Sequence, residues 1–116
     1  MSVIPFYEEA KEIVQILKVK YKPEKIILFG SLANGKADRA SDIDLMIIKQ
    51  TRKNPWERTA EVDRFIKHNV PVEFLVYTPA EVKERVQMND SFIKKILEKG
   101  QVIYEKQIHC LPYSQN

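Results

Sequence analysis

The feature that most constrains the fold is a pair of short apolar runs separated by a polar segment. The first run, residues 25–29, is Lys-Ile-Ile-Leu-Phe and ends at Gly30, and the second, residues 43–48, is Ile-Asp-Leu-Met-Ile-Ile. Short β-branched runs of this kind are typical of buried strands, since helices need about ten residues or more. The intervening residues, 31–41, are small and polar, as expected of a loop. The two runs therefore predict two strands on either side of a polar loop.

Helical patterns alternate with further strand patterns along the rest of the chain. Apolar residues recur at helical spacing over residues 6–20. Asn54 and Thr78 each precede a proline and lie three residues before a glutamate, which is the signature of a helix start with a capping box. We therefore expect an α/β fold, with a small mixed β-sheet and flanking helices. The predicted helices are 6–20, 55–68, 79–88 and 91–99, and the further strands are 72–77 and a short edge strand, 101–104.

Length and composition are consistent with one compact domain over residues 1–105, followed by a loose tail, 106–116. The 116 residues are 44% hydrophobic and 30% charged, which allows a core and argues against disorder. The net charge of +3 comes from 19 basic residues dispersed among 16 acidic ones, so no long nucleic acid is expected as a ligand. Cys110 is the single cysteine, and no apolar run approaches the roughly 20 residues of a membrane helix. Residues 1–12 do not resemble a signal peptide, and we expect a cytoplasmic protein.

Two aspartates at the start of the second apolar run are the first candidate site residues. Asp42 and Asp44 are two positions apart, so in a strand they project to the same face, roughly 7 Å apart at about 3.3 Å per residue. Neighbouring carboxylates repel one another unless a cation lies between them, and Mg²⁺ prefers such oxygen ligands. The pair is a candidate metal site, with a solvent-facing turn as the alternative.

Gly30 and Ser31 form the second candidate element, at the end of the first predicted strand. Glycine lets the backbone approach a ligand closely, and serine offers a hydroxyl and a backbone N–H to phosphate oxygens. Ten residues separate Ser31 from Asp42, enough for the chain to return so that the two elements face each other. An ordinary strand-to-helix turn is the alternative for Gly30-Ser31 alone.

Together, Gly30-Ser31, ten residues and Asp42-Ile43-Asp44 resemble the signature of the minimal nucleotidyltransferases, within the DNA polymerase β-like superfamily. The flanks agree, with a strand before Gly30 and Ser41 directly before the aspartates. The resemblance covers roughly residues 6 to 104 and implies the nucleotidyltransferase fold.

This resemblance implies a set of catalytic roles. Members of the superfamily use a third carboxylate on a neighbouring strand, which points to Glu73, although many relatives have aspartate there. Asp42, Asp44 and Glu73 are then the catalytic and metal-binding residues, with Mg²⁺ in a two-ion site and ATP as substrate. Gly30 and Ser31 would bind the nucleotide. The alternative for Glu73 is a glutamate on the exposed face of an edge strand.

The resemblance also implies a partner, because minimal nucleotidyltransferases typically accompany small helical HEPN proteins. The expected activity is that of an antitoxin that transfers AMP to a tyrosine of the HEPN-type toxin. Two alternatives stay open. One is a non-catalytic module that binds nucleotide and neutralises or scaffolds a partner, and the other is a dimer that modifies small molecules such as antibiotics. A homo- or hetero-oligomer is possible under all three hypotheses.

Three aromatic residues outside these motifs are expected to pack in or against the core, namely Trp56, Phe65 and Tyr77. The alternative is that one of them lies near the site and stacks on a base.

Overall fold

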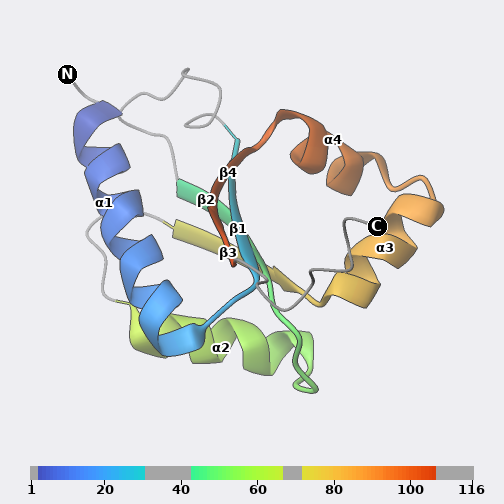
Figure 1. The fold of residues 1–116 in the computed structure, drawn as a ribbon, viewed down its shortest axis with the longest axis horizontal. Coiled ribbons are helices and arrows are strands. Elements are labelled where there is room, and N and C mark those ends of the chain that lie inside the picture. Colours follow the sequence, from blue (N-terminus) through green and yellow to red (C-terminus); the bar gives the residue numbers. More distant parts are fainter. Residues whose placement is uncertain (1–2, 31–42, 67–71, 107–116) are drawn as a thin grey trace, which may run out of the picture.

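The computed structural model describes residues 3–30, 43–66 and 72–106, which form a four-stranded sheet with helices on both faces (Figure 1). This arrangement confirms the expected α/β fold. Residues 107–116 of the expected tail, 106–116, lie outside the described part. In chain order the elements are α1 (Val3–Ile16), the π-helical turn η1 (Leu17–Tyr21), β1 (Lys25–Phe29), β2 (Ile43–Ile48), α2 (Pro55–Phe65), β3 (Val72–Tyr77), α3 (Pro79–Gln87), α4 (Ser91–Lys99) and β4 (Gln101–Glu105).

The sheet has the strand order β3-β2-β1-β4 and is mixed. β1 pairs antiparallel with β2 and with β4, whereas β2 and β3 run parallel and are connected through α2. A parallel pair needs such a crossover, because a tight turn can join only antiparallel neighbours. The expected edge position of the last strand is confirmed, and β3 forms the other edge.

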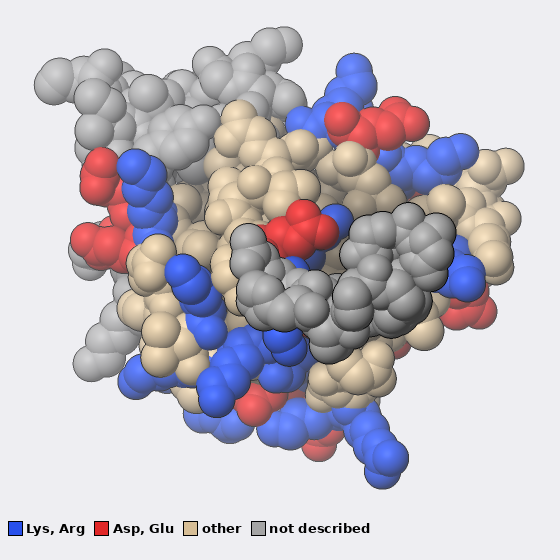
Figure 2. Space-filling view, viewed as in Figure 1, with Lys and Arg blue, Asp and Glu red and all other residues tan. Residues whose placement is uncertain are grey.

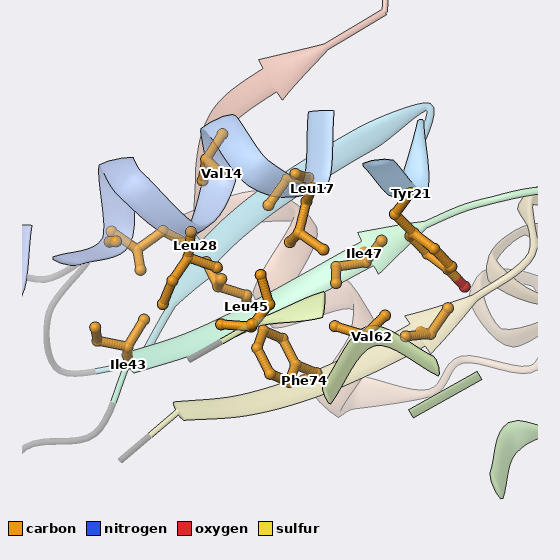
Figure 3. Packing of buried hydrophobic residues seen from close by; sticks show 14 residues of the cluster. Val14, Leu17, Tyr21, Leu28, Ile43, Leu45, Ile47, Val62 and Phe74 are labelled. Atoms are coloured by element: carbon orange, nitrogen blue, oxygen red, sulfur yellow. The ribbon is translucent and has the colours of Figure 1, made fainter. Parts of the chain in front are cut away.

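Alternate residues of each strand face two separate apolar clusters. The larger cluster lies under α1 and α2, where Val14, Leu17 and Val62 pack on the sheet (Figure 3). The smaller one lies under α4, where Ile93 and Ile96 pack on the opposite face. Because both faces of β2 are covered, the strand is apolar at every position except Asp44. The sheet residues of the larger cluster are Ile26, Leu28, Ile43, Leu45, Ile47, Phe74 and Val76, and the buried ones of the smaller are Ile27, Met46 and Ile48.

A buried arginine links α2, β3 and α3 at the end of the sheet where β3 finishes. Arg58 is only 5% exposed, and its guanidinium donates to both carboxylate oxygens of Glu81, at 2.8 and 3.1 Å. It also donates to the backbone oxygens of Lys53 (2.7 Å) and Val76 (3.3 Å). This hydrogen bonding to Arg58 lowers the pKa of Glu81 from its ordinary value of 4.5. A buried guanidinium needs such partners, because an uncompensated buried charge is strongly destabilising.

Most predicted boundaries are confirmed, and the differences have local causes. The first helix begins earlier, at Val3, and its last turn widens into η1, which Lys22 ends in a left-handed conformation (φ 58°). The second ends at Phe65, because Ile66 is already extended. Capping boxes start α2 and α3, as expected. Among the described helices, none has the length and apolar character needed to span a bilayer.

The expectation for the three aromatic residues is confirmed for two of them and wrong for the third. Phe65 and Tyr77 are partly buried and pack against the two clusters. Trp56 is 87% exposed, because it occupies an early position of α2 on the side away from the buried Val62.

The Arg58–Glu81 pair predicts a defined dependence of stability on pH. Because the pKa of Glu81 is lower in the folded than in the unfolded state, its contribution is complete above about pH 4.5 and is lost as the pH falls through the folded value. At neutral pH, Glu81→Gln should lower the free energy of unfolding by about 1 kcal/mol, a figure reduced for the partial exposure of Glu81. Urea titrations from pH 7 to pH 3 should show this difference vanish at acid pH. In an Arg58→Met background the pH-dependent part should shrink to the smaller contribution of the Thr78 backbone N–H, which also donates to Glu81, and an undiminished pH dependence there would contradict the assignment.

Tyr21 supplies a second prediction about stability. Its side chain is 2% exposed and its hydroxyl has no hydrogen-bond partner within the described residues. Burial is the main cause that raises the pKa of Tyr21 to about 12. Tyr21→Phe removes the buried hydroxyl and keeps the ring, which packs on Phe65 at 6.2 Å between centroids, so the free energy of unfolding should stay equal or rise by up to about 1 kcal/mol. Tyr21→Leu also removes the ring and should lower it by about 2 kcal/mol. A comparable loss in Tyr21→Phe would reveal a partner for the hydroxyl.

Candidate functional site

The candidate site lies at the end of the sheet where β1 finishes and β2 and β3 begin. Phe29, the last residue of β1, is the register partner of Asp44 in β2. Asp44 is in turn the register partner of Glu73 in β3. The three side chains therefore form one row across three adjacent strands. We call this set the carboxylate row, after its two acidic members, Asp44 and Glu73, which follow Phe29 across the sheet.

Asp44 and Glu73 project to the same face of the sheet. Residues two apart in a strand share a face, and Met46 and Leu75, two positions further on, both pack in the cluster under α4. Neighbouring strands are about 4.8 Å apart, which places the two carboxylates side by side on this face. Asp44 is partly buried and Glu73 is exposed. A pair of adjacent acids, one of them within a buried strand, is stabilised by a cation between them.

Gly30 lies directly against Asp44. Its backbone has φ +81°, a conformation that residues with a side chain rarely adopt. A Cβ atom at this position would lie 2.3 Å from Oδ2 of Asp44, which is closer than real Cβ contacts, and 3.2 Å from its Cγ, which is a tight contact. Glycine therefore suits this position for two reasons. It allows the positive φ of the turn after β1, and it leaves the space that the Asp44 carboxylate occupies.

The structure brings together Gly30, Asp44 and Glu73, while Ser31 and Asp42 lie outside the described residues. Within the described part of the chain, no three histidine, cysteine, aspartate or glutamate side chains form a cluster that could hold a metal ion. The residues present nevertheless suit a divalent cation in chemistry, since Asp44 and Glu73 offer hard oxygen ligands and Gly30 leaves room for the Asp44 carboxylate.

The position of Glu73 agrees in part with each of the two predictions made for it from the sequence. It is an exposed residue on the edge strand β3, as the alternative supposed, and it is also the neighbour of Asp44, as the resemblance implied. An exposed position beside Asp44 leaves the Glu73 carboxylate open to a molecule that approaches from solvent.

Sequence reasoning did not identify an aromatic pair at the other end of the row. Phe92, in the first turn of α4, contacts Phe29 edge to face, with 6.1 Å between centroids and 85° between ring planes. The position of Phe29 could have been derived, because it alternates with the buried Ile27 and directly precedes Gly30. The contact with Phe92 could not, because it joins segments more than sixty residues apart.

A hollow of about 400 Å³ lies elsewhere, at the opposite end of β3, beside Tyr77. Its lining includes Arg58 and Arg85, which form ion pairs with Glu81 and Asp90. Since these cations are paired within the fold, and neither Asp44 nor Glu73 lines the hollow, no chemistry is assigned to it.

The contact of Gly30 with Asp44 can be tested by Gly30→Ala. The positive φ and the clash with Oδ2 together should lower the free energy of unfolding by about 2 kcal/mol. In an Asp44→Ala background the clash is removed while the backbone strain stays, so the same change should cost only about 1 kcal/mol. Urea denaturation of the four proteins measures this coupling, and equal costs in both backgrounds would show that the glycine does not serve the carboxylate.

Comparison with known proteins identifies the family of the chain. Residues 11–109 match the family model described as "Polymerase beta, Nucleotidyltransferase". Two proteins of Methanocaldococcus jannaschii, both named "Putative protein adenylyltransferase", are 33% and 31% identical. The first match covers 81% of this chain and 93% of the relative, and the second covers 78% and 89%.

A solved structure agrees in fold. The crystal structure of "a putative nucleotidyltransferase from Sulfolobus solfataricus" superimposes with a TM-score of 0.65 at 27% sequence identity. The match covers 90% of this chain and 84% of that one. These matches show that the chain is a nucleotidyltransferase and belongs to the polymerase β nucleotidyltransferase family.

Proposed function

We propose that this nucleotidyltransferase transfers AMP from ATP to a hydroxyl of a partner protein, a tyrosine of a HEPN-type toxin, and so acts as an antitoxin. The observation that carries the proposal is the Asp44–Glu73 pair on one face of the sheet, with Gly30 packed on the Asp44 carboxylate. The names of the two M. jannaschii relatives support a protein as acceptor. The HEPN-type partner rests on the resemblance of the Gly-Ser and Asp-x-Asp motifs to the minimal nucleotidyltransferases.

The carboxylates divide into a binding role and a proton-accepting role. Asp44, together with Asp42, would hold Mg²⁺ and thereby the triphosphate, while Gly30 and Ser31 offer backbone groups to the phosphate oxygens. Bound Mg²⁺ would supply positive charge that offsets the charge developing on the phosphate oxygens. Glu73 would complete a second metal site or accept the proton of the acceptor hydroxyl.

The transfer itself exchanges one bond to phosphorus for another. The acceptor oxygen forms a bond to the α-phosphorus, and the bond from that phosphorus to the pyrophosphate oxygen breaks. The hydroxyl proton passes to the Glu73 carboxylate, and pyrophosphate leaves. Because Glu73 is exposed at the start of an edge strand, a side chain of another protein can reach it without displacing any described element.

The exposure of Glu73 also favours a second candidate function. A glutamate open to solvent on an edge strand is compatible with a module that binds nucleotide and a partner without catalysing transfer. A dimer that modifies a small molecule is the third candidate. The three differ in what becomes labelled by ATP that carries its label at the α-phosphate.

Labelling with this ATP and Mg²⁺, in the presence of host lysate, should mark one protein, which mass spectrometry then identifies. Asp42→Asn with Asp44→Asn should reduce labelling by about 100-fold or more, because the ligands that hold the triphosphate are lost. Glu84→Gln, an exposed change on α3, is the control and should label as wild type does. Undiminished labelling by the double variant would refute the site.

Glu73→Gln separates the enzyme from the binding module. If Glu73 accepts the proton, labelling should fall by about 100-fold while co-purification of the partner is retained. Absence of labelled protein even with the wild-type chain favours the binding module. Label on a small acceptor, without any labelled protein, favours the third candidate.

A further inference from the structure

An exposed aromatic ring stands over one end of the carboxylate row. Phe92 is 51% exposed although its ring contacts Phe29 in an edge-to-face arrangement. Phe29 is the register partner of Asp44, one strand spacing of about 4.8 Å away. In Figure 1, α4 lies beside the end of the sheet where β1 finishes, which is the end that carries this row. Phe92 therefore borders the candidate site from above the sheet.

The start of α4 is held in a defined position. Asp90 accepts hydrogen bonds from the backbone N–H groups of Phe92 (3.0 Å) and Ile93 (3.2 Å), which caps the helix. Arg85 of α3 forms an ion pair with Asp90 at 3.1 Å, and Ile93 is fully buried. The backbone of Phe92 is thus anchored, while its side chain stays largely in solvent. Because Asp90 already occupies the amide groups of this helix end, a role for Phe92 must come from its ring.

The flank of α4 that carries Phe92 is basic. Lys95 and Lys99 follow at three and seven residues, so they lie on the same flank of the helix, and both are exposed. Leu97, the other partly exposed apolar residue of α4, lies on the opposite flank. These groups are complementary to a nucleoside triphosphate with its metal ion. The aromatic ring suits the base, the lysines suit the phosphates, and the pair of carboxylates suits the metal ion.

We propose that Phe92 stacks on the nucleobase of the nucleotide whose phosphates are held at Asp44, an inference that rests on the proposed function. With the phosphates at Asp44, the sugar and base would extend across one strand spacing over β1, toward the half-exposed side chain of Phe92. Stacking on an aromatic side chain uses the π-face that every base has. Phe92 therefore binds adenine and guanine nucleotides alike, and any choice between them comes from other residues.

Binding measurements by calorimetry with Mg-ATP, Mg-GTP and inorganic tripolyphosphate test this role without relying on activity. Phe92→Leu keeps an apolar contact with Phe29 and removes the π-face, so the Kd for ATP and for GTP should rise about tenfold. The Kd for tripolyphosphate, which has no base, should not change. Phe92→Tyr should retain wild-type affinities. Trp56→Leu, which removes the most exposed aromatic side chain on α2, is the control and should have no effect.

Each outcome decides between this inference and the proposed function. Equal affinities of wild type and Phe92→Leu for ATP overturn the stacking role alone, as does an equal loss for ATP and tripolyphosphate. Reduced labelling of the partner by Phe92→Leu, at unchanged ATP affinity, would instead assign Phe92 to docking of the acceptor protein and also overturn stacking. If the wild-type chain binds neither ATP nor tripolyphosphate, the proposed function fails, and the inference fails with it.

Discussion

The pairing register of β2 with its two neighbours is the constraint on which the rest of the structure depends. β2 is covered on both faces, and Asp44 is the one polar residue in it. A slip of one residue would turn Asp44 into the cluster under α1, at the cost of burying a charge. The register that protects the core is therefore the same one that aligns Phe29, Asp44 and Glu73. Fold and site are specified by one set of strand contacts.

Much of the fold could be predicted from the sequence, because its signals are local. The strands over residues 43–48 and 72–77 were predicted with their observed limits, and capping boxes at Asn54 and Thr78 marked helix starts correctly. The features that could not be predicted from the sequence depend on tertiary contacts. The burial of Arg58 depends on Glu81, which is 23 residues away, and the exposure of Trp56 depends on which side of α2 meets the sheet. The widened turn at η1 had no signature in the pattern of apolar residues.

The candidate site also contains residues that could be predicted from local sequence signals and residues that depend on tertiary contacts. Gly30 and Asp44 could be found in the sequence because a linear spacing connects them, and the structure adds the contact between them. Glu73 could be proposed only through a resemblance, because its place beside Asp44 follows from the parallel pairing of β2 and β3. The contact of Phe92 with Phe29 could not be predicted from the sequence, because it depends on the packing of α4. Ser31 and Asp42 lie outside the described residues, so their roles stay predictions.

A contact near the end of β3 holds the edge strand that carries the exposed Glu73. On the face shown in Figure 2, lysine and arginine side chains gather mainly across the lower part, with some acidic side chains among them. Arg58 is different, because it is buried and binds both Glu81 and the backbone oxygen of Val76 near the end of β3. Arg58 thus anchors β3 near its last residues, while Glu73 lies near its first residues. Glu73 can therefore stand exposed beside Asp44 while the strand that carries it stays in register.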